Sequence, residues 1–226
     1  MFSLIFLIIF IVLLFWFVNN KVRIKFKTFF RKGFKARRGK FGVYCYCGKQ
    51  GTGKTYSVVE FLHNNCDMRI YANLQSLDLK DENGNQIDVN YIKNFSELLE
   101  LRNEHDCIIF YDEIFSALLK NTRLSKEVIN FLSQMRKRKI IFLTTAQEWT
   151  EVPLSFRRFC RYQIDCSIFN LFPFSILVKV FKDAENMKWS NDDQEHIAPI
   201  LETSISKMNL YVANSYDTFE EINDLS

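Results

Sequence analysis

Short apolar runs separated by amphipathic stretches form the main pattern of the chain after residue 40. The runs that predict buried strands occupy 41–47, 68–74, 107–111 and 140–147. The stretches with apolar residues at helical spacing, which predict helices, occupy 56–63, 95–101 and 124–139. Strands that are apolar on both faces and alternate with helices are typical of a mainly parallel sheet flanked by helices. The pattern therefore predicts an α/β fold.

Two weaker signals complete this pattern. Residues 81–86, Asp-Glu-Asn-Gly-Asn-Gln, have turn chemistry and predict a hairpin excursion between the second strand and the second helix. Residues 162–168 and 174–181 predict two further strands, with Pro173 between them, and we expect them to pair at the edge of the sheet. The second of these runs is too short to cross a membrane.

The apolar run at the N-terminus has a different character. Residues 2–18 are apolar except for Ser3, and as a helix they would rise about 25 Å, near the lower limit for crossing a bilayer. A cleaved signal peptide would need a basic segment before the run and small residues at its end, and neither is present. Trp16 fits an interfacial position. We therefore expect 1–19 to be one transmembrane anchor rather than a signal peptide or a buried core helix.

The net charge of +4 is unevenly distributed along the chain. Residues 21–40 contain ten Lys or Arg and no acid, so 41–226 carries a net charge of −6. Phenylalanines are interleaved with these bases, as in a segment that lies on anionic headgroups. Nucleic-acid contact is the weaker explanation, because the positive-inside rule already requires many of these charges. We predict that 20–40 is a basic juxtamembrane segment on the cytoplasmic side.

A complete phosphate-binding motif follows the first predicted strand. GxxxxGK[ST] is matched by Gly48, Lys49, Gln50, Gly51, Thr52, Gly53, Lys54 and Thr55. The glycines let backbone N–H groups turn toward phosphate oxygens, and the following helix adds the positive end of its dipole. Lys54 would reach the β- and γ-phosphates and Thr55 would ligate Mg²⁺. A strand before the motif and a helix after it make a purely structural glycine turn the weaker reading.

Two acids follow the third predicted strand. Asp112 would hold Mg²⁺, and Glu113 would orient or deprotonate the attacking water. This hydrophobic run ending in Asp-Glu is a weak signal by itself, but it gains weight about sixty residues after a phosphate-binding loop. Gln147 ends the next strand, where contact with the γ-phosphate or the lytic water and a merely structural role are equally open.

Arginines lie on both sides of that next strand. They are Arg136, Arg138, Arg157, Arg158 and Arg161. The motifs above account for phosphate, metal and water, but they do not supply a cation for the charge that develops on the γ-phosphate. One of these arginines would serve the site of a neighbouring subunit in a homo-oligomer, expected to be a ring. Contact with DNA phosphates or headgroups is the alternative.

Together these motifs resemble those of the Zot-type (zonular occludens toxin-like) assembly ATPases. The resemblance rests on GKQGTGKT, IIFYDE, a basic helix and IIFLTTAQ, and it covers roughly 41–165. These proteins serve filamentous and rod-shaped phages and belong to the FtsK–HerA class of P-loop NTPases. The resemblance implies ATP with Mg²⁺ as cofactors and hydrolysis that drives virion assembly, extrusion or DNA translocation at the host inner membrane.

Three functions remain open at this point. The first is a single-pass extrusion ATPase whose ATPase domain, 41–226, lies in the cytoplasm, with phage DNA or a DNA–protein complex and virion assembly proteins as partners. The second is a motor that packages double-stranded DNA into a capsid. The third is a non-enzymatic membrane scaffold or receptor. The anchor favours the first over the second, and the intact Lys54, Thr55, Asp112 and Glu113 argue against the third.

Overall fold

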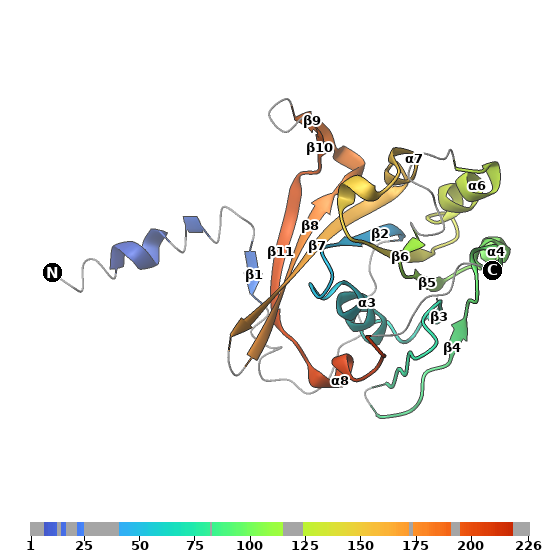
Figure 1. Cartoon of the computed structure of the whole chain (residues 1–226), viewed down its shortest axis with the longest axis horizontal. Coiled ribbons are helices and arrows are strands. Elements are labelled where there is room, and N and C mark those ends of the chain that lie inside the picture. Colours follow the sequence, from blue (N-terminus) through green and yellow to red (C-terminus); the bar gives the residue numbers. More distant parts are fainter. Residues whose placement is uncertain are drawn as a thin grey trace.

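The computed structural model describes residues 7–12, 15–16, 22–24, 41–81, 83–114, 124–171, 174–190 and 195–218. Nine strands form one sheet in the order β1-β11-β8-β7-β2-β6-β5-β3-β4 (Figure 1). They are β1 (Val22–Ile24), β2 (Gly42–Cys47), β3 (Arg69–Ala72), β4 (Val89–Tyr91), β5 (Cys107–Tyr111), β6 (Ile141–Ala146), β7 (Cys160–Leu171), β8 (Phe174–Asp183) and β11 (Ile200–Lys207). Within this sheet β8 is antiparallel to both of its neighbours, and all the other pairs are parallel. The predicted mainly parallel α/β sheet is confirmed.

Helices cover both faces of this sheet. They are α3 (Lys54–His63), α4 (Phe95–Glu100), α6 (Lys126–Gln134), α7 (Leu154–Arg157) and α8 (Leu210–Ala213). Figure 1 shows α3 and α8 below the sheet and α6 and α7 above it. Side chains alternate along β2 accordingly: Val43 and Cys45 join the core that contains α4, α6 and α7, whereas Tyr44 and Tyr46 join the core that contains α3.

The helices begin where their sequences provide caps. Asn94 accepts a hydrogen bond from the N–H of Glu97 at the start of α4, and Ser125 does the same for Val128 in α6. Val128, Leu132 and Met135 are all buried, as their helical spacing predicted. The predicted turn at 81–86 is also present, because Lys80 and Gln86 form an antiparallel bridge around it.

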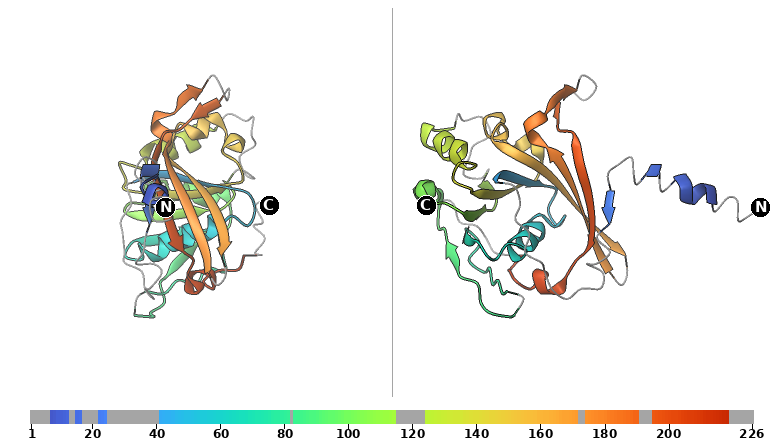
Figure 2. Two further views of the ribbon diagram at one scale, coloured as in Figure 1. Left: turned by 90° about the vertical axis from the view of Figure 1, so that its left-hand side faces the viewer. Right: turned by 180° about the vertical axis from the view of Figure 1, so that it is seen from behind.

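The C-terminal strands differ from the prediction in one respect. β7 and β8 pair antiparallel as expected, from Tyr162 opposite Asp183 to Leu171 opposite Phe174. The prediction that they lie at the edge of the sheet is wrong, because β11 and then β1 extend the sheet beyond β8. Two further strands, β9 (Lys188–Ser190) and β10 (Glu195–Ile197), form a separate antiparallel pair that projects from the ends of β8 and β11 (Figure 2).

The N-terminal part of the chain is described only in short pieces. Residues 7–12 and 15–16 are helical, and their large apolar side chains are 52–73% exposed. Among the described residues, none of the helices combines the length and the apolarity that a bilayer crossing needs. Most of the predicted anchor at 1–19, and residues 20–21 and 25–40 of the basic segment, lie outside the described residues. Both assignments stay predictions, while Val22–Ile24 pairs with β11.

Candidate functional site

The phosphate-binding loop joins the end of β2 to the start of α3. A Cβ added at Gly48, whose φ is +150°, would collide with Oγ1 of Thr52 and lie 2.8 Å from the carbonyl oxygen of Cys166. A Cβ at Gly53, where φ is +82°, would lie 2.8 Å from Cδ1 of Ile168. Both positions therefore require glycine for space as well as for backbone conformation. The loop is closely packed, and it presents the N-terminus of α3 at the carboxyl edge of the sheet.

β6 lies between β2 and β5, so the polar ends of three strands meet beside this loop. Oγ1 of Thr55 donates a hydrogen bond to Oδ2 of Asp112 at 3.2 Å. Oγ1 of Thr145, from β6, donates to the other carboxylate oxygen of Asp112. The structure thus brings together the two residues predicted to be metal ligands. It adds Thr145, which sequence reasoning could not distinguish from an ordinary strand residue.

The side-chain amide of Asn73 forms hydrogen bonds with the main chain of Asp112. Its Nδ2 donates to the carbonyl oxygen of Asp112 at 3.2 Å, and its Oδ1 accepts from the N–H of Asp112 at 2.7 Å. Sequence reasoning missed Asn73, although a polar residue near the end of the predicted strand 68–74 was a usable signal. Ligands collect at the carboxyl ends of parallel strands, where such a residue lies.

The backbone at Glu113 is in the left-handed region, with φ of +49°. This conformation costs a residue with a Cβ about 1–3 kcal/mol and persists where neighbouring contacts enforce it. The N–H of Glu113 donates to Oγ1 of Thr145 at 3.0 Å, and Asn73 fixes the preceding peptide. Two hydrogen-bonded neighbours therefore fix the backbone at Glu113, whose side chain is exposed.

Burial raises the pKa of the Asp112 carboxyl group above its ordinary value. The hydrogen bond from Thr145 opposes this shift, the charge of Glu113 adds to it, and Thr55 and Lys54 oppose it. A buried carboxylate beside a second carboxylate is an unfavourable arrangement unless a cation shares the site. Hydroxyl and carboxylate oxygens from Thr55 and Asp112 are the ligand types that Mg²⁺ takes, so the residues fit this ion.

Lys54 and Gln147 both lie next to the loop. Nζ of Lys54 donates to the carbonyl oxygen of Lys49 at 3.2 Å, which folds the lysine back over the loop. The carbonyl oxygen of Gln147 accepts from the N–H of Gly48 at 3.1 Å. The backbone of Gln147 therefore helps to fix the start of the loop, and a role for its exposed side chain stays a prediction.

Arg136, Arg138 and Arg161 lie at the opposite edge of the sheet, and the carbonyl oxygen of Arg138 accepts a hydrogen bond from the N–H of Asp106, just before β5. Arg161 donates from Nη1 to the carbonyl oxygen of Phe41 at 2.8 Å, and Nε of Arg136 would lie 3.8 Å from a Cβ at Gly42. Gly42 begins β2, and the six residues of β2 span about 20 Å before the loop starts. Arg136 and Arg161 therefore lie far from the phosphate site of their own chain.

Three of the five arginines have partners within the chain. Arg136 forms an ion pair with Glu185, Arg161 contacts Phe41, and Arg157 donates from Nε to the carbonyl oxygen of Val152 at 2.7 Å. Among the described residues, the side chains of Arg138 and Arg158 have no hydrogen-bond or ion-pair partner. Arg158 is the more exposed of these two.

Several solved structures are similar to this one. One is the N-terminal domain of zonular occludens toxin from Neisseria meningitidis, at 13% identity, with 79% of this chain and 100% of that chain covered and a TM-score of 0.50. A second is the genome packaging NTPase B204 from Sulfolobus turreted icosahedral virus 2, at 12% identity, with 73% of this chain and 100% of that chain covered and a TM-score of 0.45. A third is the flagellar accessory protein FlaH from Methanocaldococcus jannaschii, at 14% identity, with 74% of this chain and 89% of that chain covered and a TM-score of 0.42. No curated protein matches the sequence.

A family match covers the site itself. Residues 44–168, more than half of the 226-residue chain, match the sequence model of the ATPase family associated with various cellular activities. This range contains the phosphate-binding loop, Asp112 with Glu113, and all of β6. The family match, the strand order and the polar cluster around Asp112 agree with one another, and together they identify the chain as a P-loop ATPase. The chain belongs to the ATPase family associated with various cellular activities, the AAA family.

Proposed function

We propose that this ATPase is anchored in the inner membrane of a bacterial host and drives phage virion assembly or extrusion, or the movement of phage DNA. The observation that best supports ATP hydrolysis is the hydrogen-bonded group of Thr55, Asp112 and Thr145 beside the phosphate-binding loop. The sequence resemblance to Zot-type assembly ATPases and the shared fold of the toxin's N-terminal domain support the assembly role.

The residues of the site divide the hydrolytic work. Backbone N–H groups from Gly48 to Thr55 and the Lys54 ammonium group bind the phosphates of ATP. Thr55 and Asp112 would hold Mg²⁺, which would supply positive charge beside the phosphates. Glu113 accepts a proton from water as the water oxygen bonds to the γ-phosphorus. The bond to the β,γ-bridging oxygen breaks, and ADP and phosphate are formed.

The anchor and the basic segment give this ATPase a location. Residues 1–19 would cross the membrane once, and 20–40 would lie against anionic headgroups on the cytoplasmic side, where the domain 41–226 meets ATP. The exposed apolar side chains at 7–12 and 15–16 support this placement, because an aqueous setting would leave them without cover. A cytoplasm-active reporter fused after residue 226 should be active, and activity of an outside-active reporter would contradict this topology.

The arginines support a homo-oligomer. Arg158, which is exposed and has no hydrogen-bond or ion-pair partner among the described residues, is available to a neighbouring subunit or to a polyanion such as DNA. Tethering all subunits to one membrane raises their local concentration and lowers the cost of forming a ring. The remaining partners would be phage DNA or a DNA–protein complex, together with virion assembly proteins.

The assembly role is tested in cells that produce the virion. Glu113→Gln should reduce released particles about 10²-fold or more, while coat protein and viral DNA accumulate in the cell. Glu127→Gln, an exposed substitution on α6, is the matched control and should leave release unchanged. Empty capsid shells inside the cell would favour the packaging alternative, and wild-type release by the Glu113→Gln variant would refute the proposed function.

A further inference from the structure

The phosphate-binding loop rests directly on the hairpin formed by β7 and β8. Gly48 faces the carbonyl oxygen of Cys166, which would lie 2.8 Å from a Cβ added there. Gly53 faces the side chains of Ile168 on β7 and Leu177 on β8, at 2.8 and 3.1 Å from its own Cβ position. The two ends of the loop therefore share one support, and any movement of this hairpin would reach both.

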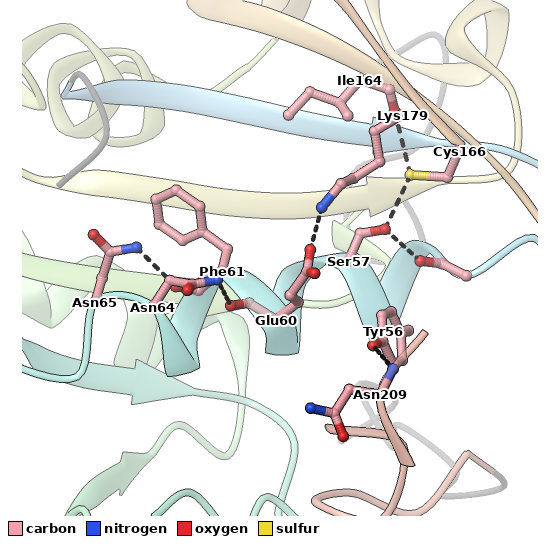
Figure 3. Close-up of polar contacts among 11 residues, drawn as sticks. Tyr56, Ser57, Glu60, Phe61, Asn64, Asn65, Ile164, Cys166, Lys179 and Asn209 are labelled. Atoms are coloured by element: carbon pink, nitrogen blue, oxygen red, sulfur yellow. Dashed lines mark hydrogen bonds and ion pairs between the residues drawn. The ribbon is translucent and has the colours of Figure 1, made fainter. Parts of the chain in front are cut away.

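A buried ion pair joins the same hairpin to α3. Nζ of Lys179 on β8 contacts Oε2 of Glu60, and the two side chains are 7% and 11% exposed (Figure 3). Glu60 lies nearly two turns after Lys54, the residue that begins α3. In Figure 3, Lys179 points from the strands toward the helix and Glu60 points back toward the strands.

A second polar link runs alongside this pair. Sγ of Cys166 on β7 donates to Oγ of Ser57 at 3.5 Å, and Oγ of Ser57 donates to the carbonyl oxygen of Gly53 at 2.7 Å. Ser57 and Glu60 are three residues apart and therefore lie on the same face of α3. Both strands of the hairpin thus hold α3 through directional contacts, at Ser57 and at Glu60.

Stability does not explain why an ion pair occupies this position. Removing two charges from water costs about as much as their attraction returns, and apolar pairs of similar volume are often equally stable or better. The apolar contacts between α3 and the sheet are non-directional, so they permit small shifts of the helix along the strands. The ion pair between an ammonium group and a carboxylate, by contrast, forms at only one position of the helix along the strands.

We propose that Lys179 is a positioning residue of the ATP site, which sets the register of α3 through Glu60 and thereby places Lys54 and Thr55 against the phosphates. The inference rests on the proposed ATPase function and deepens it. Lys179 does not contact the nucleotide in this account. It acts by fixing the helix from which the phosphate and metal ligands project.

The test compares variants of the full-length chain in detergent by melting temperature and by KM and kcat for ATP. Lys179→Met leaves Glu60 buried without this partner and should lower the melting temperature and raise KM. The double variant Glu60→Met, Lys179→Met removes both charges and should regain the wild-type melting temperature. Its kcat/KM should remain lowered by about tenfold to 10²-fold, because misplacement of catalytic groups by about 1 Å can cost about 10²-fold in rate.

Lys182→Met is the matched control. Lys182 lies on the same strand and pairs with Asp165 at 2.7 Å, but this pair is 24% and 35% exposed and does not involve α3. The control should keep the wild-type KM. A double variant with wild-type KM and kcat would overturn the proposal, as would a double variant that fails to fold, since the pair would then serve stability. Loss of ATP hydrolysis by the wild-type chain would instead refute the proposed function itself.

Discussion

The two edges of the parallel sheet hold their polar side chains in different ways. At the carboxyl edge, Asp112 is buried and bonded to Thr55 and Thr145, and Asn73 brackets its peptide group. At the opposite edge, the arginines are at least partly exposed, and Arg158 has no partner among the described residues. One edge holds a hydrogen-bonded group around a buried carboxylate, whereas the other carries cations that are open to solvent. Two such edges would complete each other across a subunit interface.

The largest loss of ATP turnover should follow from removing an arginine that acts on the phosphate site of a neighbouring subunit. Arg158→Ala should lower ATP turnover by about 10³-fold or more if Arg158 acts on a neighbour's γ-phosphate. An equimolar mixture with Lys54→Ala chains, which keep Arg158 but lack a working loop, should recover part of the activity. Lys137→Ala, an exposed substitution at the same edge, is the control. Full turnover by Arg158→Ala chains, at any protein concentration, would remove Arg158 from this role.

A smaller effect should distinguish two adjacent threonines on β6. Thr145→Val removes the hydroxyl that bonds Asp112 and Glu113 and should lower turnover about 10–100-fold. Thr144 is the matched control, because its buried hydroxyl has no hydrogen-bond partner among the described residues. Thr144→Val should keep turnover and raise the free energy of unfolding by roughly 1 kcal/mol. Equal turnover losses in the two variants would show that the hydrogen bonds of Thr145 to Asp112 and Glu113 have no special role.

The smallest effect concerns the far end of α3, away from the phosphates. Burial lowers the pKa of His63, against opposing contributions from Lys80 and Asp78, and its Nε2 lies 3.0 Å from Oγ of Ser215. Because the pKa of His63 is lower in the folded chain, the unfolded chain takes up a proton on this side chain first as the pH falls below about 6.5. The contribution of His63 to the free energy of unfolding is therefore fully present above that pH and declines below it. Wild-type protein should therefore lose a few degrees of melting temperature between pH 7.5 and 5.5.

His63→Gln keeps a hydrogen-bonding group near Ser215 but cannot titrate, so its melting temperature should fall less over the same range. Differential scanning calorimetry in matched buffers measures both curves. Parallel curves for the two proteins would show that protonation of His63 does not contribute to the loss.

The carboxyl edge could be predicted because its chemistry is local in sequence. The loop from Gly48 to Thr55 is contiguous, and Asp112 with Glu113 directly ends an apolar run, so spacing and hydropathy were sufficient. Asn73 and Thr145 were not identified, because their importance comes from strand order. Only the insertion of β6 between β2 and β5, and the position of β3 beside β5, bring these side chains to Asp112.

The C-terminal strands were harder to predict for a different physical reason. In β11, Ser204 and Ser206 face the buried side and are fully covered, while the apolar Ile205 between them is less buried. This reverses the usual alternation of apolar and polar residues in a half-buried strand. Strand β1 is hidden within the basic segment, and Lys179 reads as an interruption of an apolar run until its contact with Glu60 is known.

The central claim is that Lys54 and Glu113 perform separable tasks in one ATP site. The most direct test measures ATP affinity and steady-state hydrolysis on the same full-length preparations in detergent with Mg²⁺. Glu113→Gln should bind ATP like the wild-type chain while its turnover falls about 10²-fold or more, and Lys54→Ala should lose both binding and turnover. Wild-type turnover by either variant would contradict this account of the site.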